Sequence, residues 1–162
     1  MTQPPLKFLF LCTHNACRSI LAEAIFRQLA ADQHIVASAG SQPRGEVFPE
    51  TLSQLHQHGY DTQGLFSKSW DDLKNYDPDV VITVCDQAAG ESCPIWFGKA
   101  VKGHWGLTDA SKIPDPPQRA QCFAELITLL ETRLTRLLQL PLTELSAAEL
   151  SAALTHSEMD QK

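Results

Sequence analysis

The sequence has 162 residues, of which 43% are hydrophobic and 20% are charged, and its formal net charge is −6. This length and composition predict a single domain with a buried core and exclude collagen-like, low-complexity and disordered chains. The negative charge argues against nucleic acid and anionic membranes as partners, because both favour a basic protein surface. The sequence has no apolar run of the roughly 18–20 residues that a membrane helix needs. A small anion could still bind in a local cationic pocket.

The predicted elements alternate between strand and helix along the chain. Residues 6–12 form a nearly continuous apolar run, which is typical of a strand buried on both faces. Further apolar runs, and apolar residues spaced three or four apart, indicate the remaining elements. We expect strands at 34–39, 79–85 and 99–105, helices at 19–31, 49–58, 70–76 and 118–140, and loops rich in Gly, Pro or Asp at 86–98 and 109–117.

The chain ends in a further helical signal. Ser146 and Glu149 have the spacing of a capping box, in which each side chain accepts a hydrogen bond from the backbone of the other residue. This pattern predicts a final short helix. The sequence shows no internal repeat and no linker, so we expect one catalytic domain over 1–162, with a core at about 6–140 and a C-terminal helical extension at 141–156.

This order of elements predicts an α/β fold, a three-layer sandwich in which helices flank a four-stranded parallel sheet. In such sheets the reactive site lies beyond the carboxyl ends of the strands. Cys12 and Cys85 both fall at the ends of predicted strands. We therefore expect the two thiols to share one site.

Residues 12–19 have the features of an oxyanion-binding loop. They connect a buried strand to a helix, so that backbone N–H groups and the positive helix N-terminus can face one anion. Arg18 can hold two oxygens of a tetrahedral oxyanion, and Cys12 would lie at the base of this pocket, where its thiolate is stabilised. Ser19 could donate a hydrogen bond to that sulfur, and Asn15 tolerates left-handed backbone geometry. The predicted oxyanion-binding residues are Thr13, His14, Asn15, Ala16, Cys17, Arg18 and Ser19.

The five cysteines stand at positions 12, 17, 85, 93 and 122 and form no C-x-x-C pair. A metal site of the structural zinc type is therefore not expected. The first apolar run has no basic segment before it, so the cytoplasm is the expected compartment, and there free cysteines are either buried or reactive. We expect Cys17 to pack inward and Cys122 to lie in the core.

The C-x5-R-S motif of residues 12–19, together with Ser-Ala-Gly at 38–40, resembles the low-molecular-weight tyrosine phosphatase superfamily. The resemblance follows the order of elements over 6–140 and implies a four-stranded parallel sheet with flanking helices. Within this superfamily, the V-C-D…C-P loop at 84–94 and the segment 104–109 resemble the arsenate reductases.

The resemblance to arsenate reductases implies a thiol relay. Cys12 would attack arsenic while Arg18 and the loop amides hold the oxygens, and Asp109 would protonate the departing oxygen. Cys85 would then attack Cys12 of the adduct and release arsenite, and Cys93 would take over the disulfide. An external reductant, either thioredoxin or glutathione with glutaredoxin, would reduce that disulfide, and no bound cofactor is implied. Phosphate or sulfate would bind in the same pocket as arsenate.

Two departures from the arsenate reductase pattern leave alternatives open. Residues 86–92 number seven, one more than in thioredoxin-coupled members, so the electron donor is not fixed. The acid of the family is usually followed by proline, whereas Asp109 precedes Ala110. Asp115, which precedes Pro116, is therefore a second candidate for the acid.

Two other functions could use the same residues. A phosphatase acting on phosphotyrosine also needs Cys12 and an acid, but it normally has aromatic side chains beside the acid, and residues 107–117 contain none. A non-enzymatic redox sensor would use its thiols only to register oxidation. We favour the reductase, because Cys85 and Cys93 supply thiols that a phosphatase does not need.

Overall fold

The structure is a computed structural model that describes residues 5–84 and 99–159, with the side chains of 157–159 excepted. Cys85, Cys93 and the loop predicted at 86–98 lie outside the described residues. Within the described part of the chain, no helix is long and apolar enough to cross a membrane.

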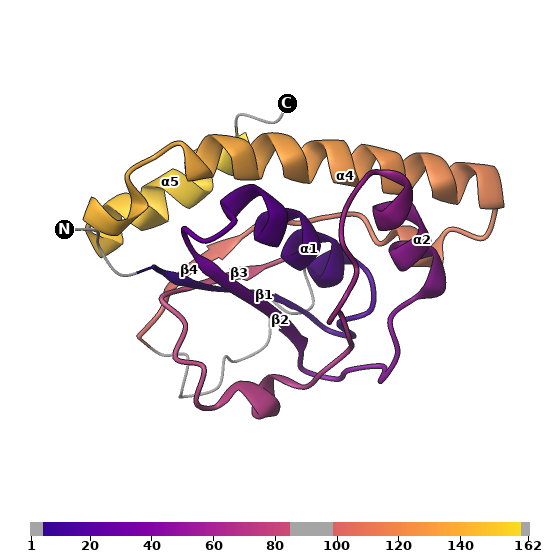
Figure 1. The fold of residues 1–162 in the computed structure, drawn as a ribbon, viewed down its shortest axis with the longest axis horizontal. Helices are drawn as coiled ribbons and strands as arrows, with labels where there is room; N and C mark the ends of the chain where they lie inside the picture. The colour runs from indigo at the N-terminus through magenta and orange to yellow at the C-terminus, as the bar shows by residue number, and fades with distance from the viewer. Residues whose placement is uncertain (1–4, 85–98, 160–162) are drawn as a thin grey trace.

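A four-stranded sheet with the strand order β2-β1-β3-β4 forms the centre of the molecule (Figure 1). Every neighbouring pair of strands is parallel, which confirms the predicted sheet. The inner strand β1 is buried on both faces, and its residues from Phe8 to Cys12 are each at most 2% exposed. This position explains the nearly continuous apolar run. The strands are β1 (Lys7–Cys12), β2 (Ile35–Gly40), β3 (Val80–Thr83) and β4 (Val101–His104).

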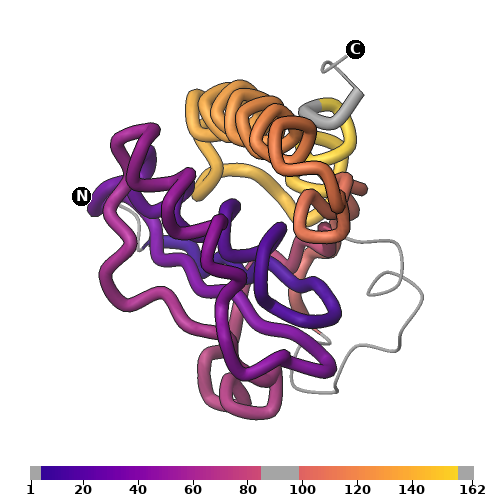
Figure 2. The backbone as a smooth tube through the Cα atoms, turned by 90° about the vertical axis from the view of Figure 1, so that its right-hand side faces the viewer, coloured from indigo at the N-terminus to yellow at the C-terminus, as the bar shows by residue number. Residues whose placement is uncertain are grey.

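Helices cover one face of the sheet, and a shorter segment covers the other. The α-helices are α1 (Arg18–Ala30), α2 (Pro49–Gln57), α4 (Pro116–Leu138) and α5 (Ala147–Met159). Figures 1 and 2 show them on one side of the sheet and the 3-10 helix η1 (Trp70–Leu73) on the other. The larger core fills the helical side, and a smaller apolar cluster packs Leu9 and Leu11 against the segment that contains η1. The predicted α/β sandwich is confirmed.

The region predicted as a loop at 109–117 differs from the expectation. It contains a 3-10 helix, η3 (Ala110–Lys112), and the start of α4. The carboxylate of Asp115 accepts a hydrogen bond from the Gln118 amide at 3.1 Å, and Pro116 follows it in the first turn. Both features start a helix, so α4 begins two residues earlier than the apolar spacing indicated.

Two other helical predictions differ from the structure in length or type. The capping box is confirmed: the Glu149 amide donates to Ser146 Oγ at 3.1 Å, and the Ser146 amide donates to Glu149 Oε1 at 2.9 Å. The helix that it starts, α5, continues to Met159 and is therefore longer than the short helix expected. The helix predicted at 70–76 is instead the single 3-10 turn η1. One further 3-10 turn, η4 (Leu142–Glu144), connects α4 to α5.

Candidate active site

The predicted anion loop lies at the carboxyl end of β1, where the strand ends at Cys12 and α1 begins at Arg18. Asn15 has a φ of 48°, which confirms the left-handed conformation expected of it. Gly40, at the end of β2, lies directly against the loop. A Cβ atom at this position would come within 3.0 Å of the Cys12 carbonyl oxygen and closer still to that of Thr13. Only glycine therefore lets β2 pack so closely against the loop.

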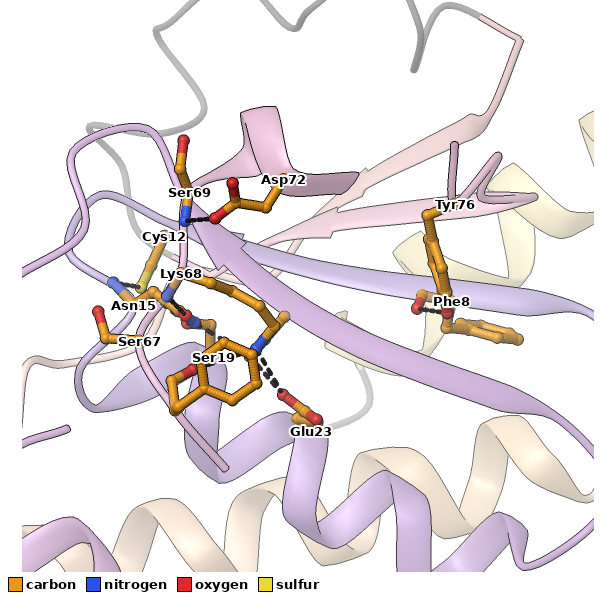
Figure 3. Close-up of polar contacts among 12 residues, drawn as sticks. Phe8, Cys12, Asn15, Ser19, Glu23, Ser67, Lys68, Ser69, Asp72 and Tyr76 are labelled. Carbon is orange, nitrogen blue, oxygen red and sulfur yellow. Dashed lines mark hydrogen bonds and ion pairs between the residues drawn. The ribbon is translucent and has the colours of Figure 1, made fainter. Parts of the chain in front are cut away.

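The Cys12 sulfur is held by two groups of its own loop. Its Sγ lies 2.9 Å from Ser19 Oγ, and the Asn15 amide donates to Sγ at 3.1 Å (Figure 3). The Asn15 side chain donates to Ser19 Oγ at 2.7 Å, so that hydroxyl already accepts one hydrogen bond and can direct its proton at the sulfur. The expected contact between Ser19 and Cys12 is confirmed. Two donors of the loop are therefore aimed at one sulfur.

The carbonyl groups of the loop are fixed by partners outside it. The carbonyl oxygens of Thr13, His14 and Ala16 all accept hydrogen bonds from the chain that follows β2 or from the 67–69 segment. These contacts set the loop conformation before any anion binds. The donors are the backbone amides of Gln42, Arg44 and Phe48 and the hydroxyl groups of Thr51 and Ser67, at distances between 2.9 and 3.2 Å.

A small pocket opens above Cys12, and an ion pair lies in its wall. The Arg18 guanidinium donates to Asp109 Oδ2 at 3.3 Å, and Ser111 donates to Asp109 Oδ1 through both its amide and its hydroxyl, at 3.1 and 2.6 Å. An oxyanion on the loop would compete with the Asp109 carboxylate for the guanidinium. The pocket is lined by Cys12, His14, Ala16, Cys17, Arg18, Arg44, Asp109 and Ser111.

The two candidate acids occupy different places. Asp109 lies in the pocket wall beside Arg18, whereas Asp115 caps the N-terminus of α4 and is exposed there. The geometry therefore favours Asp109 as the group that could exchange a proton with a bound anion. Asp109 ends the segment 104–109 that resembles the arsenate reductases, whereas Asp115 lies beyond it.

The loop holds a second thiol in a different environment. Cys17 is 3% exposed, so the inward packing expected of it is confirmed. Burial, and then the negative charge of Asp109, raise the pKa of Cys17 to about 12, although Arg18 and a hydrogen bond from Thr51 act in the opposite direction. Cys17 is therefore a thiol near neutral pH. Cys122 is only partly buried on α4, against the core, and burial raises its pKa as well.

Two charged residues that the sequence did not indicate lie behind the loop. The Asn15 side chain donates to Ser38 Oγ at 3.0 Å, and Ser38 donates to Glu23 Oε1 at 2.6 Å. The Lys68 ammonium lies 3.7 Å from the same Glu23 oxygen. Figure 3 shows this pair beside the loop. Glu23 carried one unused signal, because it is an acidic residue on a helix whose neighbouring positions are nearly all apolar, whereas nothing local to Lys68 indicated a role.

The site offers donors for an anion rather than ligands for a metal. Among the described residues, no cluster of three or more His, Cys, Asp or Glu side chains has the geometry to hold a metal ion. The loop instead presents a guanidinium and the N-terminus of a 13-residue helix, both of which attract negative charge.

Comparison with known proteins is consistent with this geometry. The pattern that defines the low molecular weight phosphotyrosine protein phosphatase family matches residues 7–151. The chain belongs to this family. The match covers the sheet, the anion loop, α4 and the start of α5, so the resemblance inferred from the C-x5-R-S motif is confirmed.

Relatives within this family bear the name arsenate reductase. One from Staphylococcus epidermidis is 32% identical over 105 residues, which are 65% of this chain and 79% of that protein. The structure of a thioredoxin-dependent arsenate reductase from Corynebacterium glutamicum is 30% identical, with a TM-score of 0.65, and the match covers 86% of this chain and 63% of that one. An arsenate reductase in a phosphate-binding state has a TM-score of 0.68 at 26% identity, over 83% of this chain and 97% of that one.

Proposed function

We propose that this protein reduces arsenate to arsenite through a relay of thiols, with Cys12 as the nucleophile. The observation that carries the proposal is the pocket at the end of β1, where the Cys12 sulfur accepts hydrogen bonds beside the Arg18 guanidinium. A thiolate at the base of a cationic pocket is suited to attack a tetrahedral oxyanion. The relatives named arsenate reductases support arsenate as that oxyanion.

In the first step the Cys12 thiolate attacks arsenic, an S–As bond forms, and one arsenate oxygen leaves as water. Arg18 and the loop amides bind the remaining oxygens, so that negative charge developing on them is stabilised. We assign to Asp109 the proton for the leaving oxygen. Its carboxyl group lies in the pocket wall, 3.3 Å from the Arg18 guanidinium that would bind the anion.

In the second step the Cys85 thiolate attacks Cys12 Sγ. An S–S bond forms as the S–As bond breaks, and the electron pair of the broken bond stays on arsenic, which leaves as arsenite. Cys93 then attacks Cys85 and releases the Cys12 thiolate, and an external dithiol reduces the disulfide between Cys85 and Cys93. The described backbone supports exchange between Cys12 and Cys85, because the residues that precede them are paired: the Val84 amide donates to the Leu11 carbonyl at 2.8 Å.

A coupled assay tests the proposal. We expect arsenate-dependent oxidation of NADPH when the protein is supplied either with thioredoxin and thioredoxin reductase or with glutathione, glutaredoxin and glutathione reductase. The pair that supports turnover identifies the electron donor, which the seven-residue spacing between Cys85 and Cys93 leaves open. If neither system supports turnover of the folded protein, the reductase proposal is wrong.

The Cys85→Ser variant separates reduction from phosphate-ester hydrolysis. Without the second thiol, the variant should still bind arsenate at Cys12 but should not complete multiple turnovers. Hydrolysis of p-nitrophenyl phosphate needs only the loop and an acid, so it should not depend on Cys85. Fast hydrolysis that the variant retains, together with absent arsenate turnover in the natural chain, would favour a phosphatase instead.

A further inference from the structure

The orientation of the Asn15 side chain decides where the Ser19 proton points. The Lys68 backbone amide donates to Asn15 Oδ1 at 2.8 Å, which fixes that atom as the oxygen of the amide group. The nitrogen then faces Ser19 and Ser38 and donates to both. Because Ser19 Oγ accepts from Asn15, its own proton is available to Cys12 Sγ at 2.9 Å.

A buried carboxylate ends this chain of hydrogen bonds. Glu23 is 7% exposed and accepts a hydrogen bond from the Ser38 hydroxyl at 2.6 Å. An ionised Glu23 fixes the Ser38 hydroxyl as a donor in that direction, so that Ser38 Oγ can accept from Asn15. A carboxylate buried to this degree stays ionised only with a compensating cation or several donors.

Lys68 supplies that cation, and its side chain is itself largely covered. Its side chain is 9% exposed, and its ammonium lies 3.7 Å from Glu23, 3.1 Å from the Phe66 carbonyl oxygen and 4.3 Å from the centre of the Phe66 ring. The charged groups facing it are Glu23 on α1 and Asp72 on η1, which raise its pKa, whereas burial lowers it more strongly. A lysine covered to this degree is unlike a solvated surface lysine, and its ammonium has defined contacts with Glu23 and Phe66.

We propose that Lys68 is a positioning residue for Cys12: its amide orients Asn15, and its ammonium pairs with the Glu23 carboxylate that ends the chain of hydrogen bonds, so that the Ser19 proton is directed at the Cys12 sulfur. Figure 3 shows these groups on one path from Lys68 to the thiol. The inference concerns the state of the sulfur in the anion loop. It therefore stands whether the substrate is arsenate or another oxyanion.

The test measures the reactivity of Cys12 without any substrate. Iodoacetamide alkylation is followed from pH 5 to pH 9 in the full chain, and peptide fragmentation separates Cys12 from Cys17. In Lys68→Met we expect alkylation of Cys12 at pH 7 to slow by about tenfold or more, because a hydrogen bond to a charged sulfur is lost, and the midpoint of the pH profile to rise by about one unit. Lys68→Arg should restore most of the rate, since it keeps the positive charge beside Glu23, whereas the backbone amide that orients Asn15 is present in both variants.

A second variant and a matched control keep the result interpretable. Glu23→Gln removes the negative charge at the other end of the same chain and leaves only a neutral acceptor for Ser38, so it should slow alkylation in the same direction. The double variant should be no slower than the slower single variant, because both act on one path. Lys74→Met removes an exposed lysine after η1 and should change nothing. The charged groups lining the pocket, His14, Arg18, Arg44 and Asp109, stay unchanged in every variant.

An unchanged pH profile in folded Lys68→Met or folded Glu23→Gln would overturn the positioning role, and so would additive effects in the double variant. Because no arsenate and no second thiol enter the measurement, this failure is distinct from failure of the reductase proposal. Conversely, a shifted profile together with absent arsenate turnover would support the role of Lys68 and reject the substrate.

Discussion

Two ion pairs flank the anion loop, one in front of it and one behind. Arg18 and Asp109 lie at the pocket, with side chains 13% and 12% exposed, and Lys68 and Glu23 lie behind the loop at 9% and 9%. Burial alone therefore hardly separates them. What separates them is their position: the front pair faces the space where an anion would bind, whereas the rear pair is joined through Ser38 to the side chain that orients the loop.

This difference indicates two separate tasks. The front pair has to exchange partners, because an oxyanion would replace the Asp109 carboxylate at the guanidinium. The rear pair does not line the pocket, and under our proposal it keeps one arrangement so that the Ser38 and Ser19 hydroxyl groups stay oriented. Variants at the front should therefore alter binding and proton transfer, and variants at the rear should alter the reactivity of the thiol.

The largest effect is expected between the two pairs, at the sulfur itself. Cys12→Ser replaces a nucleophile that ionises readily by one that does not, so arsenate reduction should fall by at least about 1,000-fold. Phosphate should still bind, because the loop amides and Arg18 remain. Steady-state assays and isothermal titration with inorganic phosphate measure the two properties. A Cys12→Ser protein with substantial activity would assign the nucleophile to another thiol.

Breaking the front pair at its cation should affect binding and rate together. Arg18→Lys keeps the charge but loses the planar fork that holds two oxygens, so kcat/KM should fall by about 100-fold and phosphate affinity should weaken. The pH profile of Cys12 alkylation should move less than in Lys68→Met. If the two variants have the same effect on both measurements, the front and rear pairs do not have separate tasks.

Breaking the front pair at its anion tests the assignment of the acid. Asp109→Asn keeps the shape and the contacts with Ser111 but cannot supply a proton, so kcat should fall by about 100-fold. The control is Asp115→Asn, in which asparagine remains a good cap for α4 and little change is expected. A large loss of kcat in the control alone would transfer the acid role to Asp115.

A smaller effect, on stability, is expected from Cys17, a thiol of the anion loop that stays protonated near neutral pH. Its pKa in the folded protein is about 12, above its ordinary value of 9.0, so the native state binds this proton more tightly. The resulting stability is complete below pH 9 and is lost between pH 9 and pH 12, at about 1.4 kcal/mol per pH unit. Cys17→Ala should remove this slope. Urea unfolding between pH 8 and pH 10.5 measures it, and equal slopes for both proteins would contradict it.

The sequence predicted the parts of this site that are close together along the chain. Cys12, Asn15, Arg18 and Ser19 fall within eight residues, and the strand and helix beside them have clear apolar patterns, so both the loop and its place in the fold could be predicted. Local signals also identified the sheet and the cap at Ser146.

The rear pair could not be predicted in this way. Glu23 and Lys68 lie 45 positions apart and meet only because β2 and the segment after it bring residues 67–69 beside the loop. The prediction of a loop at 109–117 was wrong for a different reason. Pro and Asp are frequent in loops, but here Asp115 and Pro116 start a helix, and composition alone does not distinguish the two uses.

The smallest effect should arise far from both pairs, at the start of α5. Ser146→Ala removes the hydroxyl that accepts from the Glu149 amide at 3.1 Å, and loss of such a cap lowers the free energy of unfolding by about 1 kcal/mol. Alkylation of Cys12 and phosphate binding should not change, because α5 packs against β4 and α4 rather than against the loop. Ser146→Asp, which can still cap the helix, is the matched control and should keep the stability. If Ser146→Ala altered the reactivity of Cys12, the loop would depend on more of the molecule than the two pairs that flank it.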